Sequence, residues 1–224
     1  MSEIAKNIAI LKQTIPANAR LIAVSKTKPV SDILEAYNAG QRLFGENRVQ
    51  ELLSKKDHLP VDIQWHLIGH LQSNKVKFIL PFISMIQSVD TNKLLKTINA
   101  EAAKISRVVD CLLQIHIAEE ETKFGFNMEE IVQMIESSDF SDMKNVRICG
   151  VMGIATFTSD QNQVNKEFTY LSDCFSTIKN KYFSADPDFK EISMGMSGDY
   201  RIALKAGSTI VRIGSLIFGE RNKR

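Results

Sequence analysis

The stretch LIAVSKTKPVSDILEAYNAG, from Leu21 to Gly40, contains one predicted strand followed directly by one predicted helix. Its opening LIAVS is almost entirely apolar, as in a parallel strand that is buried on both faces. Pro29 stands near the start of the following amphipathic segment and Gly40 just past its end, which are the usual limits of a helix. The stretch therefore predicts a βα unit, the building block of parallel sheets.

The same alternation extends from this unit to the end of the chain. Eight apolar runs are strand candidates, at residues 21–26, 42–47, 63–70, 85–90, 108–117, 146–156, 191–196 and 209–219. Each of the first seven is followed by a predicted helix, at residues 29–40, 48–56, 73–82, 91–106, 128–138, 161–183 and 197–207. Eight units of this kind, joined by right-handed parallel crossovers, predict a closed (β/α)8 TIM barrel. An open flavodoxin-like sheet is the alternative if one or two short strands are miscounted.

An extra helix is predicted before the first strand, because apolar residues recur at helical spacing within residues 1–20. Lys6 and Lys12 interrupt its apolar run, so it is not a signal peptide. No stretch reaches the roughly 20 apolar residues that a membrane span needs. We expect a soluble, cytoplasmic protein whose residues 1–224 form a single α/β domain with no membrane partner.

The composition excludes several classes of function. The formal net charge is +2, and basic residues are interleaved with acidic ones, so nothing favours nucleic acid as a partner. The three cysteines form no CxxC pair and are read as buried apolar residues in a reducing compartment. No spacing of His, Cys, Asp and Glu is typical of a metal site.

Active sites of such barrels lie at the carboxyl ends of the strands, and this rule selects residues without any motif. The first strand ends at Lys26, and a lysine at the tip of a buried strand is either solvated or reactive. The second ends at Glu46 and Asn47. We expect Asn47 to hydrogen-bond a bound ligand, and Glu46, of opposite parity, to be structural.

A phosphate site is predicted after the seventh and eighth strands, where TIM barrels usually build one. GMSGD offers Ser197 and Gly198 before a helix, and IGS offers Gly214 and Ser215. Hydroxyls and oriented backbone N–H groups can bind phosphate without a basic side chain. Each turn alone is also compatible with ordinary capping.

Arg212 shares the strand parity of Gly214, so it points into the barrel if Gly214 does. An inward arginine stays charged and needs an acceptor such as a phosphate, a carboxylate or a ring nitrogen. An outward arginine that extends between the helices to solvent is the alternative.

A reactive lysine, a phosphate cup and an arginine together fit pyridoxal 5′-phosphate bound as a Schiff base. From these residues alone, a lysine-dependent class I aldolase that takes a sugar phosphate fits almost equally well. The visible absorption spectrum distinguishes the two, because an aldolase without the cofactor is colourless.

Five long motifs then carry a family resemblance: AVSKTKP, FGENRVQE, WHLIGHLQSNK, SMGMSGDY and VRIGSLIFG, in this order between Leu21 and Gly219. In them the chain resembles the pyridoxal-phosphate homeostasis protein family, whose members are similar to the barrel domain of alanine racemases and eukaryotic ornithine decarboxylases. The resemblance implies a Schiff base on Lys26, and phosphate contacts from Ser197, Gly214 and Ser215. It also implies that Arg212 faces the pyridine nitrogen.

An arginine in that position has a chemical consequence. It donates a hydrogen bond without losing its proton, so the ring nitrogen stays unprotonated and the ring is a weaker electron sink. Alanine racemases add a tyrosine base from a second domain, and we expect no second domain here because the chain ends at Arg224. The resemblance therefore implies a monomeric carrier or buffer in intracellular pyridoxal-phosphate homeostasis, without established catalytic turnover, that supplies apo-enzymes. A pyridoxal-phosphate-dependent amino-acid racemase is the alternative.

The remaining candidates are less determined. Met194 and Met196 are expected to pack at the mouth, with Met194 against the cofactor ring. Whether His66 and His70 are structural or approach the cofactor is left open, and so is the role of Lys123, which stands where alanine racemases have an arginine near the phenolic oxygen.

Overall fold

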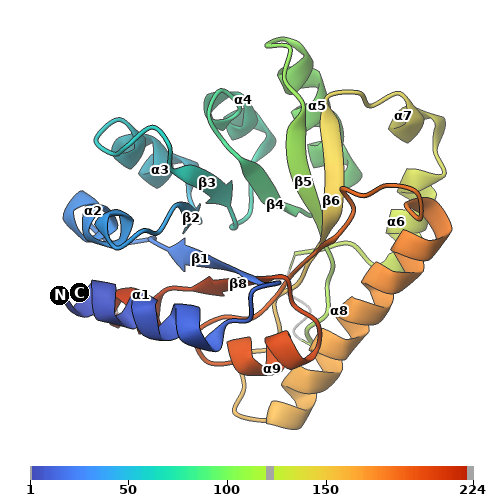
Figure 1. Ribbon diagram of the computed structural model, residues 1–224. Coiled ribbons are helices and arrows are strands. Elements are labelled where there is room, and N and C mark those ends of the chain that lie inside the picture. Colours follow the sequence, from blue (N-terminus) through green and yellow to red (C-terminus); the bar gives the residue numbers. More distant parts are fainter. Residues whose placement is uncertain (1, 120–123, 221–224) are drawn as a thin grey trace.

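The computed structural model describes residues 2–119 and 124–220, and its eight strands form a closed barrel (Figure 1). Each strand pairs in parallel with the next, and the last pairs with the first. The strands are β1 Arg20–Val24, β2 Leu43–Glu46, β3 Gln64–Leu67, β4 Met85–Val89, β5 Val109–Gln114, β6 Val146–Met152, β7 Glu191–Ser193 and β8 Ile210–Ile213. The predicted TIM barrel is confirmed, and the open-sheet alternative is wrong.

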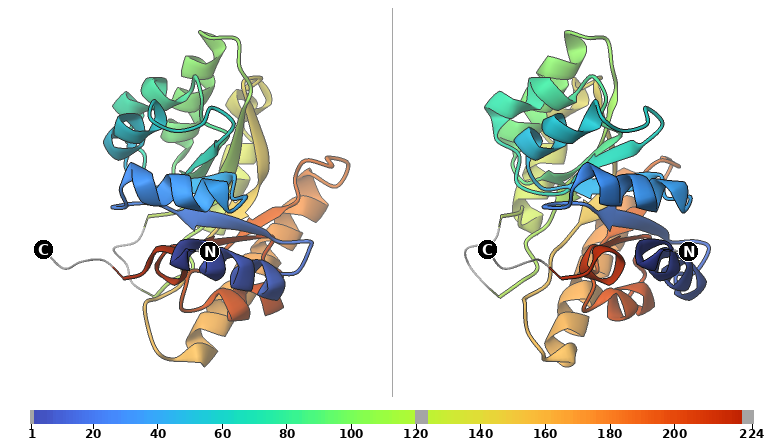
Figure 2. Two further views of the ribbon diagram at one scale, coloured as in Figure 1. Left: turned by 60° about the vertical axis from the view of Figure 1, so that its left-hand side comes forward. Right: turned by 90° about the vertical axis from the view of Figure 1, so that its left-hand side faces the viewer.

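Helices cover the outside of this barrel. They are α1 Glu3–Thr14, α2 Val30–Asn38, α3 Val49–Lys56, η1 Ser73–Lys75, α4 Val76–Ile79, α5 Asn92–Ala103, α6 Met128–Ile135, α7 Ser138–Ser141, α8 Gln161–Tyr182, α9 Tyr200–Lys205 and α10 Ser215–Phe218. The predicted extra helix is α1, which starts where the Ser2 side chain accepts a hydrogen bond from the Ala5 N–H. It lies beside α10, where Asn7 donates to the Ile217 carbonyl (Figure 2).

The eighth strand, β8, is shorter than the predicted one, which covered the whole apolar run at residues 209–219. Pairing stops at Ile213, and the chain turns at Gly214 into α10. The Gly214 carbonyl accepts hydrogen bonds from the N–H groups of Ile217 and Phe218, both of which are buried. Burial of an apolar stretch thus selects a helical turn here, because α1 offers an apolar surface beyond the end of the barrel.

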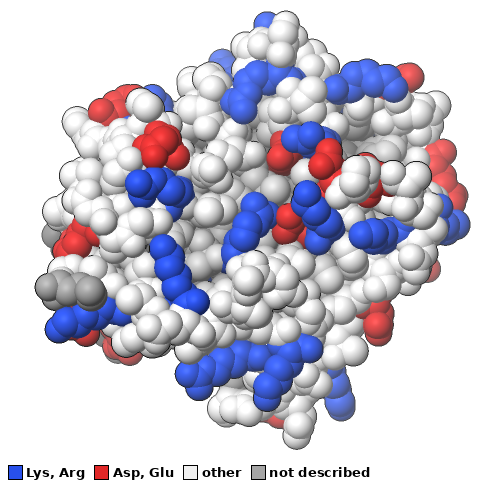
Figure 3. Space-filling model, in the orientation of Figure 1, with Lys and Arg blue, Asp and Glu red and all other residues white. Residues whose placement is uncertain are grey.

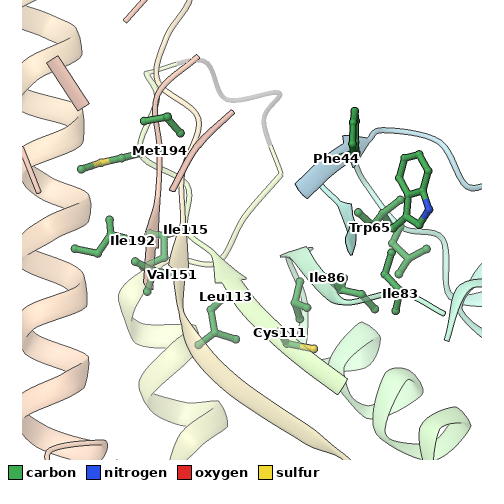
Figure 4. Packing of buried hydrophobic residues seen from close by; sticks show 14 of the residues in the cluster. Phe44, Trp65, Ile83, Ile86, Cys111, Leu113, Ile115, Val151, Ile192 and Met194 are labelled. Atoms are coloured by element: carbon green, nitrogen blue, oxygen red, sulfur yellow. The ribbon is translucent and has the colours of Figure 1, made fainter. Parts of the chain in front are cut away.

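Two apolar clusters hold the barrel together. Side chains inside it include Ile22, Val24, Ile68 and Ile210, as strand parity predicts. The larger cluster fills the space between strands and helices, and Figure 4 shows the part of it around Phe44 and Leu113. Within the described ranges, no helix is both long and apolar enough to cross a membrane.

Two glycines allow the chain to approach itself closely at the carboxyl ends of the strands. A Cβ on Gly69 would lie 2.5 Å from the Asn47 carbonyl oxygen, so only glycine lets the ends of β2 and β3 meet there. Gly195 has a φ of +95°, and a Cβ on it would lie 2.5 Å from the Ala203 Cβ on α9. These contacts fix the loops that carry Asn47 and Ser197.

Candidate functional site

A pocket of about 640 Å³ opens at the carboxyl ends of the strands. Most of the residues that the sequence selected line it, although they come from four different strand ends: Lys26, Asn47, Ser197, Gly198, Arg212, Gly214 and Ser215. The first two follow β1 and β2, and the others belong to β7, β8 and the loops after them. Closure of the barrel, with β8 beside β1, brings these ends together.

Met194 does not line the pocket, so its expected contact with the cofactor ring is not supported. It is fully buried in the outer cluster, and Figure 4 shows it on the same side of the chain as Ile192. Ser193 points into the barrel, and its chain neighbour therefore points outward. Met196, beyond the end of β7, lines the pocket instead.

Lys26 stands in a tight turn directly after β1. The Lys28 N–H donates to the Ser25 carbonyl at 3.0 Å, and Thr27 between them has a φ of +65°. This is the left-handed region, which a β-branched residue rarely adopts and which clusters at functional sites. Lys26 is half-buried at the pocket wall.

Lys28 also lines the pocket, although a solvated role is the simpler expectation from its sequence. Its Nζ donates to the carbonyl oxygens of Phe218 and Gly219, at 2.7 and 3.2 Å. It therefore ties the turn after β1 to the end of α10, across the seam where the barrel closes.

The predicted phosphate cup is formed by the loops after β7 and β8. The backbone N–H groups of Gly214 and Leu216 point to Ser197 Oγ, with donor–acceptor distances of 3.4 and 3.5 Å. A Cβ built on Gly198 would meet nothing within 4 Å, so the space beside its backbone is open. Hydroxyls and backbone donors thus border a cavity large enough for an anion.

Arg212 points into the barrel and is buried, so the outward alternative is wrong. Its Nη1 donates to Ser193 Oγ at 2.6 Å, and its Nη2 donates to the Gly153 carbonyl at 2.9 Å. Burial lowers the pKa of Arg212 to about 10, and the charge of Asp199 opposes this fall. Because Arg212 lines the pocket, a positive charge lies at its base at neutral pH.

A chain of hydrogen bonds leads from Arg212 across the barrel interior. Ser193 Oγ donates to Gln87 Oε1 at 2.6 Å, so the amide nitrogen of Gln87 faces His66 Nδ1, 2.8 Å away. That nitrogen is a donor, so His66 Nδ1 must accept and its proton sits on Nε2. Burial lowers the pKa of His66 to about 3. His66 is therefore buried and neutral near pH 7, with its ring fixed by Gln87.

His70 lies outside the pocket wall. Its Nδ1 is 2.6 Å from Asp90 Oδ2, and its ring stacks on Phe124 with 4.1 Å between centroids. Lys123 lies outside the described residues. Among the residues that the structure does describe, no group of three or more His, Cys, Asp or Glu could hold a metal ion.

Comparison with known proteins identifies the family of this chain. The family model for the alanine racemase N-terminal domain matches residues 1–222. The chain is 39% identical over 204 residues to the pyridoxal phosphate homeostasis protein of Aquifex aeolicus, which covers 91% of this chain and 87% of that protein. It is 38% identical to the protein of the same name from Pongo abelii, over 96% of this chain and 82% of that one.

The chain belongs to the pyridoxal phosphate homeostasis protein family. A solved structure similar to this barrel is PipY of Synechococcus elongatus with pyridoxal phosphate bound, at 33% identity and a TM-score of 0.87. The match covers 96% of this chain and 100% of PipY. An alanine racemase from Clostridium difficile has a TM-score of 0.77 at 12% identity, over 99% of this chain and 56% of that one, and shares the fold.

One wall of this family member's pocket was missed by the sequence reasoning. The loop after β6 contributes Ile154, Thr156, Phe157 and Ser159. The Glu167 carboxylate on α8 holds this loop, because it accepts from both the N–H and the hydroxyl of Thr156 at 2.6 Å. The rule that sites lie at the carboxyl ends of strands would have selected the stretch GIATFTS, but it carries no charged residue to draw attention.

Proposed function

We propose that this pocket binds pyridoxal 5′-phosphate and that the protein acts in pyridoxal-phosphate homeostasis as a carrier or buffer of the cofactor. The observation that carries the proposal is that Lys26, Arg212 and the Ser197–Gly214 cup line a single pocket. The names of the relatives and the cofactor in the PipY structure support it. In this reading, residues 1–224 act as one cofactor-binding domain.

The residues present fit that group. Among the described residues the buried side-chain oxygen of Asn47 finds no hydrogen-bond partner, and such an atom is costly unless a ligand or solvent satisfies it. The space beside Gly198 is open where a phosphate would approach the backbone. In the proposed complex, Ser197, Ser215 and the N–H groups near Gly214 hold the phosphate, and Asn47 bonds a polar group on the ring side.

Lys26 supplies the covalent attachment in this proposal. Its amine adds to the aldehyde carbon, a C=N bond forms, and the aldehyde oxygen leaves as water to give a Schiff base. When bound, the cofactor supplies an electron sink for reactions at the α-carbon of amino acids. Arg212 donates to the ring nitrogen and, since it keeps its proton, leaves that nitrogen unprotonated.

We further propose that the protein has no enzyme-like turnover. The supporting observation is that Arg212 lines the pocket while it donates to Ser193 and to the Gly153 carbonyl, because a guanidinium keeps its proton at neutral pH and so would leave the ring nitrogen unprotonated. The relatives are named for homeostasis and not for a reaction, which agrees with a carrier. That the protein is a cytoplasmic monomer and supplies apo-enzymes stays a prediction.

The test is the visible absorption of the purified protein with pyridoxal phosphate, before and after reduction with borohydride. We expect absorption typical of a Schiff base, a reduced adduct that survives denaturation, and a label on Lys26 in the digested protein. A label on Lys28 would contradict the assignment. A colourless protein that binds a sugar phosphate would favour the aldolase.

A further inference from the structure

The residue before Lys26 is held from outside the barrel. Ser25 is fully buried, and its hydroxyl donates to Glu46 Oε1 at 2.7 Å. Its carbonyl accepts a hydrogen bond from Lys55 Nζ, on α3, at 2.9 Å. Both the side chain and the backbone of Ser25 are therefore fixed by groups that do not touch the pocket.

The residue after Lys26 is held by the same helix. The Thr27 N–H donates to Glu51 Oε1 at 2.5 Å, and Thr27 is the residue with a φ of +65°. A β-branched residue in this region is strained by about 1–3 kcal/mol and persists only where surrounding contacts impose it. Glu51 is one such contact.

Lys55 joins the two sides. Its Nζ lies 2.8 Å from Glu46 Oε1 and 2.6 Å from Glu51 Oε1, in addition to the Ser25 carbonyl. An ammonium has three N–H donors, and here each has an acceptor. The Lys55 side chain is 8% exposed and the Glu46 side chain 0%. We call Glu46, Glu51 and Lys55 the Lys55 clamp.

Stability alone is a weak reason for such a cluster. Burial raises the pKa of Glu46, which the hydrogen bond from Lys55 opposes, and within residues 2–119 and 124–220 Glu46 Oε2 has no hydrogen-bond partner. Buried ion pairs add little stability compared with apolar side chains of similar volume, and their geometric specificity is the better-supported benefit. The feature that this cluster specifies is the backbone on both sides of Lys26.

We propose that the Lys55 clamp aims the Lys26 amine into the pocket, so that Glu46, Glu51 and Lys55 are positioning residues for Schiff-base formation. This proposal rests on the proposed function in that Lys26 is the residue that bonds the cofactor. The clamp lies behind the backbone and the phosphate cup belongs to the loops after β7 and β8, so the two are physically separate. Loss of the clamp should slow the covalent step and leave phosphate binding intact.

This separation gives a test with two ligands. Pyridoxine 5′-phosphate has the same ring and phosphate but an alcohol in place of the aldehyde, so it reports binding without the covalent bond. The variants are Lys55→Met and Glu51→Ala. Their matched controls on α3 are Lys56→Met and Gln50→Ala. Lys56 pairs with Asp57, and Gln50 is exposed.

We expect both clamp variants to form the Schiff base roughly 10- to 100-fold more slowly, because small displacements of a reacting group cost rate on this scale. Their affinity for pyridoxine 5′-phosphate should stay within about twofold of wild type. Glu51→Gln should recover most of the rate, since its amide oxygen can still accept from the Thr27 N–H. The controls should behave as wild type.

Two outcomes overturn the clamp while leaving the proposed function standing: wild-type rates in both variants, or equal losses for both ligands, which would show general damage to the pocket. If Lys55→Met does not fold, Glu51→Ala decides, because Glu51 is partly exposed and tolerates substitution better. A wild-type protein that binds both ligands but forms no adduct on Lys26 overturns the proposed covalent function and the clamp with it.

Discussion

Arg212 Nη1 lies 2.6 Å from Ser193 Oγ, so the buried guanidinium at the base of the pocket is held by the neighbouring strand. The Ser193 hydroxyl donates its hydrogen bond to Gln87 Oε1 and therefore faces Arg212 with a lone pair. The orientation of the arginine thus depends on an amide that lies on the far side of the barrel. Each link is a donor–acceptor pair with a fixed direction, and the chain of links fixes the orientation of the guanidinium, which can only donate hydrogen bonds.

Replacement of that serine should change the bound cofactor as well as stability. In Ser193→Ala the Arg212 Nη1 loses its acceptor, and a buried donor without a partner costs about 1–3 kcal/mol. We expect a lower free energy of unfolding in urea and a shifted absorption band of the bound cofactor. Ser208→Ala is the control, since Ser208 is also buried and its hydroxyl donates to the backbone carbonyls of Ile192, Met194 and Ile210. An unshifted band in Ser193→Ala would show that Arg212 does not face the ring.

The phosphate cup should account for much of the cofactor affinity. Ser197→Ala and Ser215→Ala each remove a hydroxyl beside the proposed phosphate, and a lost hydrogen bond to a charged group costs about 1.5–3 kcal/mol. Each variant should therefore bind pyridoxal phosphate roughly one to two decades more weakly, as measured by titration. Pyridoxal, which has no phosphate, should show little difference between variants and wild type. Equal wild-type affinity for the two ligands would mean that the pocket has no phosphate site.

The carrier reading predicts slow chemistry on amino acids. The protein with its cofactor is incubated with L-alanine or L-serine in deuterated water, and exchange of the α-proton is followed by NMR. We expect exchange much slower than about 1 s⁻¹, the lower end of ordinary enzyme turnover. Faster exchange with racemisation would restore the racemase alternative.

Arg212→Glu sharpens that experiment. A carboxylate at this position favours a protonated ring nitrogen and hence a stronger electron sink. Exchange should rise in the variant, provided that titration shows it still binds the cofactor. Unchanged exchange, absorption and affinity would place Arg212 away from the ring.

His66 predicts a dependence of stability on pH. The pKa of His66 is about 3 in the folded protein, whereas an unfolded histidine titrates near 6.5. Between these values the unfolded chain binds a proton that the folded one does not, so stability is complete above pH 6.5 and is lost as pH falls toward 3. The free energy of unfolding should drop by about 1.4 kcal/mol per pH unit below 6 from this group.

Urea unfolding at pH 7 and pH 5 measures this drop. His66→Gln removes the titrating group but keeps an acceptor for Gln87, so its stability should change less between the two pH values. His58→Gln, at an exposed position, is the control and should keep the wild-type dependence. A wild-type slope in His66→Gln would assign the pH dependence to other groups.

The pattern of apolar residues predicted much of the molecule. Alternation along β1 grouped Ile22 and Val24 on one face, which the structure places inside the barrel. Parity on β8 grouped Arg212 with Gly214 but left an outward Arg212 open, and the structure decides for the inward direction. Met194 was expected at the mouth from its position near the end of the seventh strand, but Ser193 takes the inward position and Met194 packs in the outer cluster. Strand length depends on neighbouring strands that a local pattern does not contain.

The hydrogen-bond chain from Arg212 to His66 and the Lys55 clamp could not be predicted from the sequence, for a related reason. Gln87 meets Ser193 across 106 residues, and Lys55 meets Ser25 across 30. Neither pairing leaves a motif, because each depends on which strand ends the closed barrel brings together. Parity predicted that Glu46 turns away from the pocket, but its partners Ser25 and Lys55 became known only from the packing of β1, β2 and α3.

The seam between β8 and β1 also sets when the pocket can first exist. Lys26 lies in the first βα unit to leave the ribosome and Arg212 in the last strand, so a growing chain carries the lysine long before the arginine on the other side of the pocket is made. Lys28 cannot bond the carbonyls of Phe218 and Gly219 until the end of α10 has been synthesised. The pocket that Lys26 and Arg212 share therefore forms only after the chain has been made through α10 and the barrel has closed, so binding by both halves at once cannot begin on a shorter nascent chain.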